Sequence, residues 1–262
     1  MIGKCLQFHT ISNNFIHTSQ LRGLKLRSTM DARVALTHII CSEWAKNLTT
    51  STLAFDIAQF FPSLNHQLLP LILDKAGLNW KILIFFKNYL VGRKTKCLWN
   101  NFISLFFNMN IRISQELALS PILSALYLSP VFHSFENCLK ILKIPISTIS
   151  FVDNSIFIFQ SKFILHSNAN LFYCYNIILS LLTKYGLVVE HGKTDIFHFS
   201  RSHSLFKLPP LNLSPLWGLV LLPKDTWKYL GFIFELQTQF QKSYRFLCKQ
   251  GDFHNQMYEV AW

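Results

Sequence analysis

Two acidic residues stand where apolar, β-forming stretches of the sequence end or turn. Asp56 lies between Phe55 and Ile57, and Asp153 lies in the run 151–154. A charge is costly to bury, so a carboxylate in such a setting needs a partner. Two carboxylates from adjacent strands could hold Mg²⁺ and leave coordination positions for phosphate oxygens. In the alternative, structural interpretation, Asp56 caps a helix and Asp153 shapes a turn.

The elements around these acids can be predicted from the apolar patterns. Residues 52–57 are predicted as a strand that ends at the first acid. Residues 147–159 are predicted as a hairpin with Asp153-Asn154 at its turn. Residues 187–190 and 194–199 are predicted to form a second hairpin around His191-Gly192-Lys193, and 227–234 a last aromatic strand. The region 208–223, which contains four of the nine prolines, is predicted as a loop.

Helical spacing of apolar residues connects these strands. We expect helices over 65–76, 80–91, 120–142 and 163–185, three of which are followed by a glycine. Pro121 lies in the first turn of the third of these helices, where a missing amide proton costs little. This order of elements predicts an α+β fold with a mainly antiparallel sheet.

Composition narrows the class of partner. The net charge is +12, half of the residues are hydrophobic and 25 are Phe. An intrinsically disordered basic tail would lack that apolar content and is excluded. The positive excess points to a polyanion, either nucleic acid or an anionic membrane surface. Two prolines and several polar residues interrupt the uncharged stretch 117–135, and polar residues interrupt 163–183, so we expect no membrane span. Residues 1–12 hold no sustained apolar run, so we expect an intracellular rather than a secreted protein.

Another candidate site is weaker. His198, Ser200, Arg201, Ser202 and His203 combine metal-ligating and nucleophilic residue types. No further ligand or acid follows at a matching spacing, so the sequence favours a basic surface strand here. The six cysteines are at least 36 residues apart, which excludes a CxxC metal or redox motif.

Six blocks follow one another along residues 20–235. They are Gly23–Ala32, Phe55–His66, Ser114–Pro121, Phe151–Asn154, Gly186–Thr194 and Trp227–Gly231. In order and spacing they resemble the blocks of reverse transcriptases, in particular those of non-LTR (LINE-type) retrotransposons of a fungal kind. The third block resembles Q-G-x-x-L-S-P, and the fourth resembles the F/Y-x-D-D catalytic hairpin. The resemblance implies a right-hand polymerase palm with partial fingers and RNA-templated DNA synthesis from dNTPs.

The resemblance also assigns catalytic roles. Asp56 and Asp153 would be the metal-binding carboxylates for Mg²⁺, with Asn154 next to them in the catalytic hairpin. Lys193 would lie near the leaving pyrophosphate, where an ammonium neutralises developing charge; the alternative is a solvated turn lysine. RNA template and DNA primer would be the partners, and we infer no obligate protein partner.

Four further residues are implied to contact the nucleotide or the template. Phe61 matches the aromatic residue that lies under the incoming sugar and excludes a 2′-hydroxyl, with plain core packing as the alternative. Gln115 and Glu116 would line the nucleotide and template, and Arg27 lies in the finger-region block.

Two departures from the family pattern affect the expected activity. Asn154 replaces the second acid of the hairpin, and an amide binds Mg²⁺ less well than a carboxylate does. Glu116 replaces a glycine, which adds bulk and negative charge near phosphates. We therefore expect this chain to be inactive or severely impaired, with a non-catalytic nucleic-acid-binding retroelement remnant as the alternative. A membrane-surface protein is a third possibility from composition alone.

The expected domains follow the blocks. Residues 1–50 would form partial fingers, 51–235 the reverse transcriptase palm, and 236–262 a truncated thumb or connection remnant. The expected fold is thus an α+β polymerase palm, an antiparallel sheet with packed helices, with the thumb essentially missing.

Overall fold

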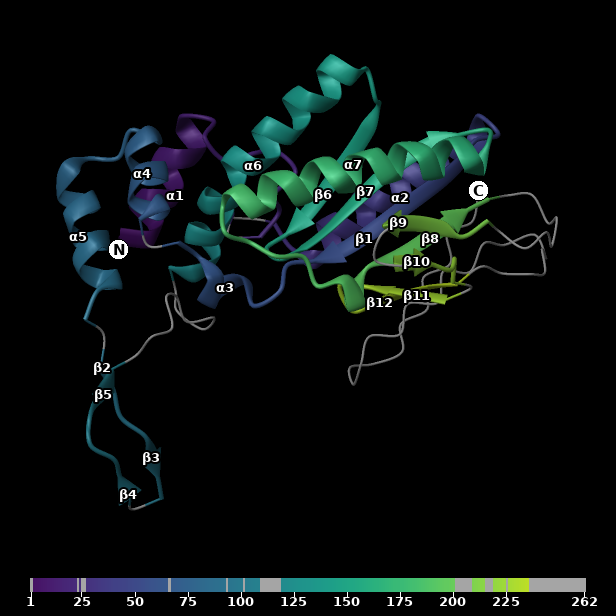
Figure 1. Ribbon diagram of the computed structural model, residues 1–262. Coiled ribbons are helices and arrows are strands. Elements are labelled where there is room, and N and C mark those ends of the chain that lie inside the picture. The colour runs from purple at the N-terminus through teal and green to yellow at the C-terminus, as the bar shows by residue number, and fades with distance from the viewer. Residues whose placement is uncertain are drawn as a thin grey trace.

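A four-stranded antiparallel sheet forms the centre of the computed structural model (Figure 1). Its strands are β1 (Thr49–Asp56), β6 (Ile146–Phe151), β7 (Asn154–Ser161) and β8 (Asp195–Phe199), in the order β6-β7-β1-β8. The structure describes residues 2–22, 24, 27–65, 67–92, 94–100, 102–108, 119–200, 209–214, 219–224 and 226–235.

Side chains of β1 alternate between two cores. Leu53 and Phe55 belong to the larger core, whereas Ala54 packs against the smaller one. This alternation follows from the two-residue period of a strand. Because β1 is hydrogen-bonded to β7 on one side and β8 on the other, it lies in the interior of the sheet.

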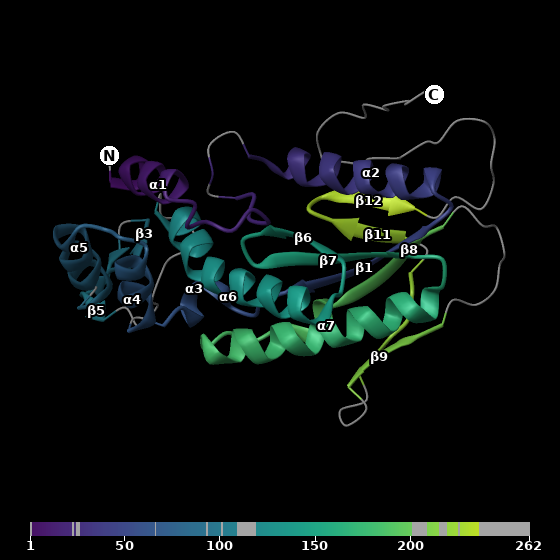
Figure 2. The ribbon, with the colours of Figure 1, turned by 90° about the horizontal axis from the view of Figure 1, so that it is seen from above.

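Two long helices cover the face with the larger core (Figure 2). They are α6 (Ser120–Leu142) and α7 (Ile164–Lys184), which pack against each other. In α7 the buried residues Leu171, Tyr175, Ile178 and Leu182 recur with helical spacing. Both helices were predicted from the sequence, and Pro121 lies in the first turn of α6 as expected.

The opposite face is covered by α2 (Thr29–Ala45) and by a small hairpin of β11 (Thr226–Tyr229) and β12 (Phe232–Glu235) (Figure 2). A capping box starts α2: the Asp31 carboxylate accepts the Ser28 N–H at 2.7 Å, and the Ser28 hydroxyl accepts the Asp31 N–H. Its buried residues, which follow a four-residue spacing, are Ala32, Leu36 and Ile40.

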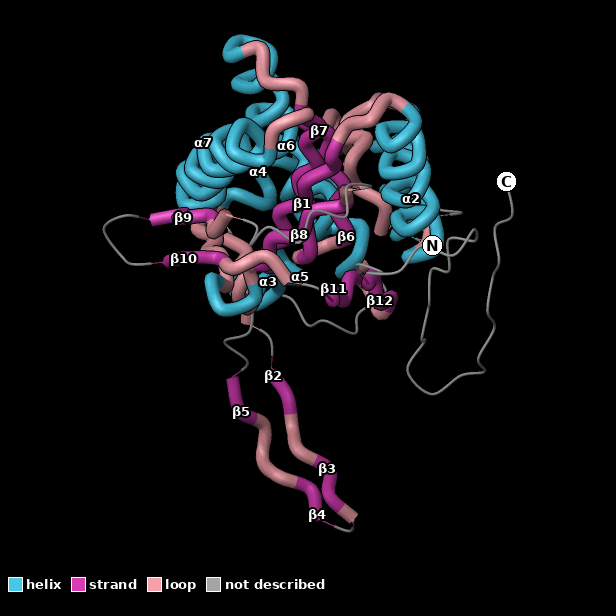
Figure 3. The backbone as a smooth tube through the Cα atoms, turned by 90° about the vertical axis from the view of Figure 1, so that its right-hand side faces the viewer, coloured by secondary structure: helices cyan, strands magenta, loops and turns pink. Residues whose placement is uncertain are grey.

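Shorter elements form one end of the molecule (Figure 1). They are α1 (Ile2–Ser12), α3 (Phe60–Ser63), α4 (Leu68–Lys75) and α5 (Trp80–Leu90). A thin hairpin extends away from the body (Figure 3), built from β2 (Lys94–Thr95), β3 (Leu98–Trp99), β4 (Phe102–Ile103) and β5 (Phe107–Asn108). No helix in the described part of the chain is long and apolar enough to cross a membrane.

The hairpin predicted over 187–199 is wrong. Residues His191–Lys193 form a short 3₁₀ helix, η1, and Val189 bridges to Ile57 beyond the end of β1. Within this stretch β8 is a strand of the sheet, and its partner is β1 rather than the preceding segment. The Gly-Lys pair suggested a tight turn, but long-range pairing to β1 determined the structure.

Other boundaries differ by less. The hairpin over 147–159 is confirmed, with its turn at Val152-Asp153, so that Asn154 already belongs to β7. The stretch 227–234 is a hairpin rather than one strand, because Leu230 and Gly231 adopt positive φ and turn the chain. The predicted loop 208–223 contains β9 (Leu211–Ser214) and β10 (Leu219–Leu221), which pair with each other.

Candidate active site

Asp56 and Asp153 meet at one end of the sheet. Asp56 is the last residue of β1 and lies opposite Asn154 in the register of β1 and β7. The Ile57 N–H donates to the Asp153 carbonyl oxygen at 3.1 Å, which ties the two acid-bearing segments together. Asp56 at the end of β1 and Asp153 in the β6-β7 turn therefore lie at the same end of the sheet, as the resemblance implied.

The turn that carries Asp153 has an unusual backbone. Phe151 and Asn154 pair across the hairpin, so Val152 and Asp153 form a two-residue loop. Val152 has φ of 64° although it is β-branched, and its side chain is buried. Left-handed backbone is unfavourable for such a residue, so the packing around Val152 must hold the turn in place.

Asp56 is held through its backbone and its side chain. Its carbonyl accepts the Glu190 N–H at 2.8 Å, and its Oδ2 accepts a hydrogen bond from Lys193 Nζ at 2.8 Å. Its Oδ1 is buried and has no hydrogen-bond partner among the described residues. One carboxylate oxygen is thus paired with a cation and the other is available for a ligand.

The electrostatics of the two acids are coupled. Burial, and then the nearby charge of Asp56, raises the pKa of Asp153. The hydrogen bond to Asp56 and the attraction between the two charges raise the pKa of Lys193. Negative charge is therefore concentrated at this edge of the sheet, where the ammonium of Lys193 is bonded to Asp56. Such an arrangement is favourable for a bound cation.

A second basic residue, Arg22, was missed by the sequence analysis. Its guanidinium lies 5.5 Å from the centre of the Phe151 ring, and its charge partly counters the rise in the pKa of Asp153. The segment before Arg22 pairs with β6, since Leu21 N–H donates to the Ser150 carbonyl. This residue lies just before the first motif block, so only the fold shows its position.

Lys193 is positioned by η1. The neighbouring His191 shares a 2.8 Å hydrogen bond with the Tyr175 hydroxyl of α7. Tyr175 is buried against Phe55, one residue before the acid at the end of β1. The packing of Tyr175 against Phe55 therefore helps to fix the backbone position of η1 and of Lys193, whose side chain is exposed.

Asn154 is exposed beside the acid pair. Its Nδ2 donates to Asp153 Oδ1 at 3.4 Å. The F/Y-x-D-D hairpin that this turn resembles has a second carboxylate at this position. The amide of Asn154 instead donates a weak hydrogen bond, so the site has one negative charge fewer.

The sequence profile described as reverse transcriptase (RNA-dependent DNA polymerase) matches residues 1–234. The chain belongs to the reverse transcriptase family. A search of the curated proteins found no match.

Solved telomerase structures share the fold. Telomerase from Candida tropicalis in complex with a TWJ fragment of telomeric RNA is 14% identical, with a TM-score of 0.61 over 96% of this chain and 37% of that one. Apo telomerase from the same yeast, truncated from its C-terminal domain, is 16% identical, with a TM-score of 0.60 over 90% and 43%. Telomerase from Candida albicans in complex with a TWJ fragment of telomeric RNA is 13% identical, with a TM-score of 0.55 over 90% of this chain and 38% of that one. This reverse transcriptase chain spans less than half of those chains.

The remaining residues implied by the reverse transcriptase blocks lie in different surroundings. Phe61 is 8% exposed and packs edge-on against Phe60 in the larger core. Arg27 is exposed just before α2, where its charge helps to lower the pKa of Asp31, after the larger effect of hydrogen bonds from Ser28. Gln115 and Glu116 lie outside the described residues.

His198 corrects one expectation. The sequence favoured a basic surface strand here, but His198 is 1% exposed within β8 and shares a 2.8 Å hydrogen bond with the Ser51 hydroxyl. Burial lowers its pKa to about 4, so its ring is neutral at pH 7. This strand of the reverse transcriptase sheet is buried because it pairs with β1, which the local sequence does not reveal. Residues 201–203 of the same candidate cluster lie outside the described residues.

Proposed function

We propose that this chain is a reverse transcriptase palm in which Asp56 and Asp153 hold divalent metal ions, with Mg²⁺ as the native ion. The reaction would be RNA-templated DNA synthesis from dNTPs on a DNA primer. The backbone hydrogen bond between Ile57 and Asp153 carries this proposal, because it joins the two acid-bearing segments at one end of the sheet.

The residues present fit a hard divalent cation. Asp56 Oδ1 is buried and unpartnered within the described part of the chain, and Asp153 is disfavoured as an anion in the absence of a cation. Mg²⁺ uses one or two carboxylates together with substrate phosphates. When bound, such ions lower the charge barrier between the primer 3′-hydroxyl and the triphosphate.

We assign Lys193 as the countercharge of this site. In the structure its ammonium donates to Asp56 Oδ2, while most of the side chain is exposed. A bound cation would compete with Lys193 for the carboxylate. The released ammonium would then be free to pair with the pyrophosphate that leaves, which is the role the sequence implied.

We further propose that catalysis is severely impaired. Asn154 would remove a negative charge beside the proposed metal-binding acids, and the resemblance implies that Glu116 would add one near the substrate phosphates. If the two changes together cost ~4 kcal/mol of transition-state stabilisation, the rate would fall ~10³-fold. Gln115 would still line the template, and Arg27 would contact nucleic acid from the finger region. Phe61 would lie under the incoming sugar and exclude a 2′-hydroxyl; its burial against Phe60 supports the alternative, plain core packing.

The finer family assignment rests on the six sequence blocks. We propose a non-LTR, LINE-type retrotransposon origin of a fungal kind, with partial fingers in 1–50, the palm in 51–235 and a thumb or connection remnant in 236–262. DNA that flanks this reading frame should encode an endonuclease of such an element; codons for a telomerase-type RNA-binding domain there would contradict the subtype.

Primer extension on an RNA template tests the catalytic proposal. We expect the unchanged chain to extend a primer barely, and Asn154→Asp with Glu116→Gly to raise the rate at least ~10-fold in Mg²⁺ without full recovery. Adding Asp153→Asn to that double variant should abolish extension. The matched control is Asp74→Asn, which alters an exposed acid of α4. Extension that survives Asp153→Asn would refute the assigned metal ligands.

The net charge of +12 favours a second candidate, a nucleic-acid-binding protein without catalysis. Affinity for RNA should fall steeply with salt in both cases, because counterions are released on binding. Only the second candidate predicts tight binding together with no metal-dependent extension in the Asn154→Asp, Glu116→Gly variant. Absence of any RNA binding at low salt would contradict both.

A further inference from the structure

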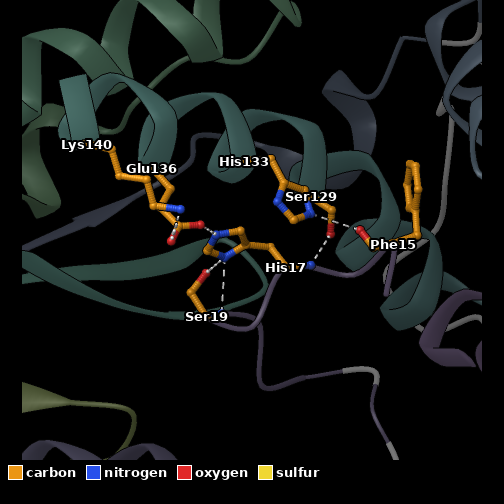
Figure 4. A network of polar contacts seen from close by, with 7 residues as sticks. All are labelled: Phe15, His17, Ser19, Ser129, His133, Glu136 and Lys140. Atoms are coloured by element: carbon orange, nitrogen blue, oxygen red, sulfur yellow. Dashed lines mark hydrogen bonds and ion pairs between the residues drawn. The ribbon is translucent and has the colours of Figure 1, made fainter. Parts of the chain in front are cut away.

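Two histidines and a glutamate converge beside α6, away from the six sequence blocks. His133 and Glu136 are one helical turn apart on α6, so their side chains lie on the same side of the helix. His17 comes from the segment that follows α1 (Figure 4). One ligating atom from each of the three lies within 4.8 Å of the other two.

The hydrogen bond of His133 fixes its tautomer. Its Nε2 lies 3.3 Å from the Phe15 carbonyl oxygen (Figure 4). A carbonyl oxygen can only accept, so Nε2 carries the proton and Nδ1 keeps its lone pair. An imidazole that donates one N–H to a carbonyl is the arrangement by which proteins orient a metal-ligating histidine.

His17 is held from both its backbone and its ring. Its N–H donates to the Ser129 hydroxyl at 3.0 Å, and its Nδ1 lies 2.8 Å from the Ser19 hydroxyl. Its Nε2 lies 3.2 Å from Glu136 Oε2. Burial lowers the pKa of His17, so the ring is neutral at pH 7. The Ser19 N–H donates to His17 Nδ1 at 3.2 Å, and the Glu136 carboxylate can only accept, so Nε2 carries the ring proton in this structure. A metal bound at Nε2 would replace this proton, which would move to Nδ1 and be donated to the Ser19 hydroxyl.

We propose that His17 Nε2, His133 Nδ1 and the Glu136 carboxylate form a binding site for a divalent transition metal of the zinc type. Two imidazoles and one carboxylate suit Zn²⁺ or Co²⁺ rather than Mg²⁺. Ligand atoms of a tetrahedral zinc site lie about 3.3 Å apart, so the three groups must close by at most about 1.5 Å. The exposed His133 side chain and the half-exposed Glu136 have room to do so.

A pocket of about 260 Å³ adjoins the cluster. His17 and Glu136 line it together with Ser147 and Thr148 of β6. A water molecule in this pocket would complete a four-coordinate site.

The position of the site indicates a structural role. The Ser19 carbonyl accepts the Ser150 N–H, and Leu21 N–H donates to the Ser150 carbonyl, so the segment after His17 lies along the edge of β6. Arg22 then lies over Phe151, next to the turn with Asp153. A metal bound to His17 would fasten this segment to α6 and so hold Arg22 near the acid pair.

Lys140 competes with the metal for Glu136. Its Nζ lies 3.0 Å from Glu136 Oε1 on the same helix, and its charge opposes a cation at this place (Figure 4). Lys140→Ala should therefore strengthen metal binding, by about 3-fold for the loss of one exposed competing charge. A purely structural hydrogen-bond cluster predicts no metal response to this change.

Calorimetric titration of the metal-free full chain with Zn²⁺ tests the site, and Co²⁺ spectra identify the ligand type. We expect a Zn²⁺ site that persists in Asp153→Asn and is therefore separate from the acid pair, stabilisation of the chain by Zn²⁺, and at least ~10-fold weaker binding in His133→Ala and Glu136→Gln. His38→Ala, an exposed histidine of α2, is the matched control. His133 is exposed, so its variant should fold even where His17→Ala does not.

Three results would overturn the proposal: no Zn²⁺ binding, binding that His133→Ala leaves unchanged, or a Co²⁺ spectrum dominated by thiolate. The Asp153→Asn variant should bind Zn²⁺ as the unchanged chain does. The zinc site can therefore be confirmed or refuted separately from the proposed polymerase function.

Discussion

In the first half of β1, Thr50, Ser51 and Thr52 are fully buried, whereas at the end of the strand Asp56 faces a second carboxylate. Ser51 is bonded to the neutral ring of His198, and the Thr52 hydroxyl donates to a backbone carbonyl of β8. The buried half of the strand is thus polar but uncharged.

The end of the strand is different. Asp56 and Asp153 are both acids, and the ammonium of Lys193 is bonded to Asp56. A fold selected for stability alone would not place like charges together at a half-buried edge. The comparison teaches that the first half of the strand tolerates buried polar groups because they are neutral, while the charged pair at its end lowers stability, as the proposed metal site requires.

The largest effect is expected on the free energy of unfolding, through His198, which is bonded to the uncharged first half of β1. His198 titrates near 4 when folded and near its ordinary 6.5 when unfolded. Its contribution is fully present above pH 6.5 and is lost as the pH falls towards 4, because the unfolded chain binds the proton more readily. The loss should reach about 3 kcal/mol, since one pKa unit corresponds to about 1.4 kcal/mol.

Urea denaturation between pH 7 and 4 measures this loss. His198→Asn keeps a hydrogen-bonding side chain next to Ser51 but does not titrate, so its stability profile should be flatter. The exposed His38→Ala serves as control. Equal pH profiles for the unchanged chain and His198→Asn would show that the ring is not held neutral.

A smaller effect is expected at the charged end. The folded pKa of Asp153 is raised, so its ionisation opposes folding: the favourable contribution is present at low pH and is lost as pH rises through the folded pKa. Asp153→Asn should therefore raise the melting temperature at pH 7, by roughly 1–3 °C. The gain should shrink on acidification.

Calorimetric melting curves at several pH values, with and without Mg²⁺, test whether the ionisation of Asp153 lowers the stability of the fold. Mg²⁺ should stabilise the unchanged chain and leave Asp153→Asn unaffected. If Asp153→Asn were less stable than the unchanged chain at pH 7, the charged end of β1 would not lower stability and the comparison of the two ends would be wrong.

The smallest effect concerns Lys193. Its side chain is two-thirds exposed, so the ion pair with Asp56 is largely screened by solvent. Lys193→Met should lower the melting temperature only slightly without metal, but it should increase the stabilisation by Mn²⁺, because the competing cation is gone. Lys162→Met, at an exposed lysine after β7, is the control. A weaker response to Mn²⁺ in Lys193→Met would contradict its role as countercharge.

The meeting of the two acid-bearing segments could be predicted from the resemblance to reverse transcriptases. The local patterns alone left a helix cap at Asp56 and a turn at Asp153 as the alternative, and in the structure Ile57 is hydrogen-bonded to Asp153. The helices α6 and α7 were predictable from local patterns, since their apolar spacing is long and regular.

What escaped prediction depends on distant pairing. Val189 bridges Ile57, so the segment before η1 does not turn back on β8 as its sequence suggests. Arg22 and His17 reach their positions because their segment lies along β6, far later in the chain. His198 is buried because β8 pairs with β1. None of these contacts leaves a periodic signal in the sequence.

The strand order β6-β7-β1-β8 has a consequence for biosynthesis. Leu53 in β1 pairs with Phe157 and Ile196, both far further along the chain. At about 5–20 residues per second, β1 leaves the ribosome roughly 5–20 s before either partner. During that interval its apolar residues have no sheet to join, and such non-local pairing makes folding slow. The helix α2 precedes β1 in the chain and packs against it, so it can cover one face of the central strand until the sheet closes.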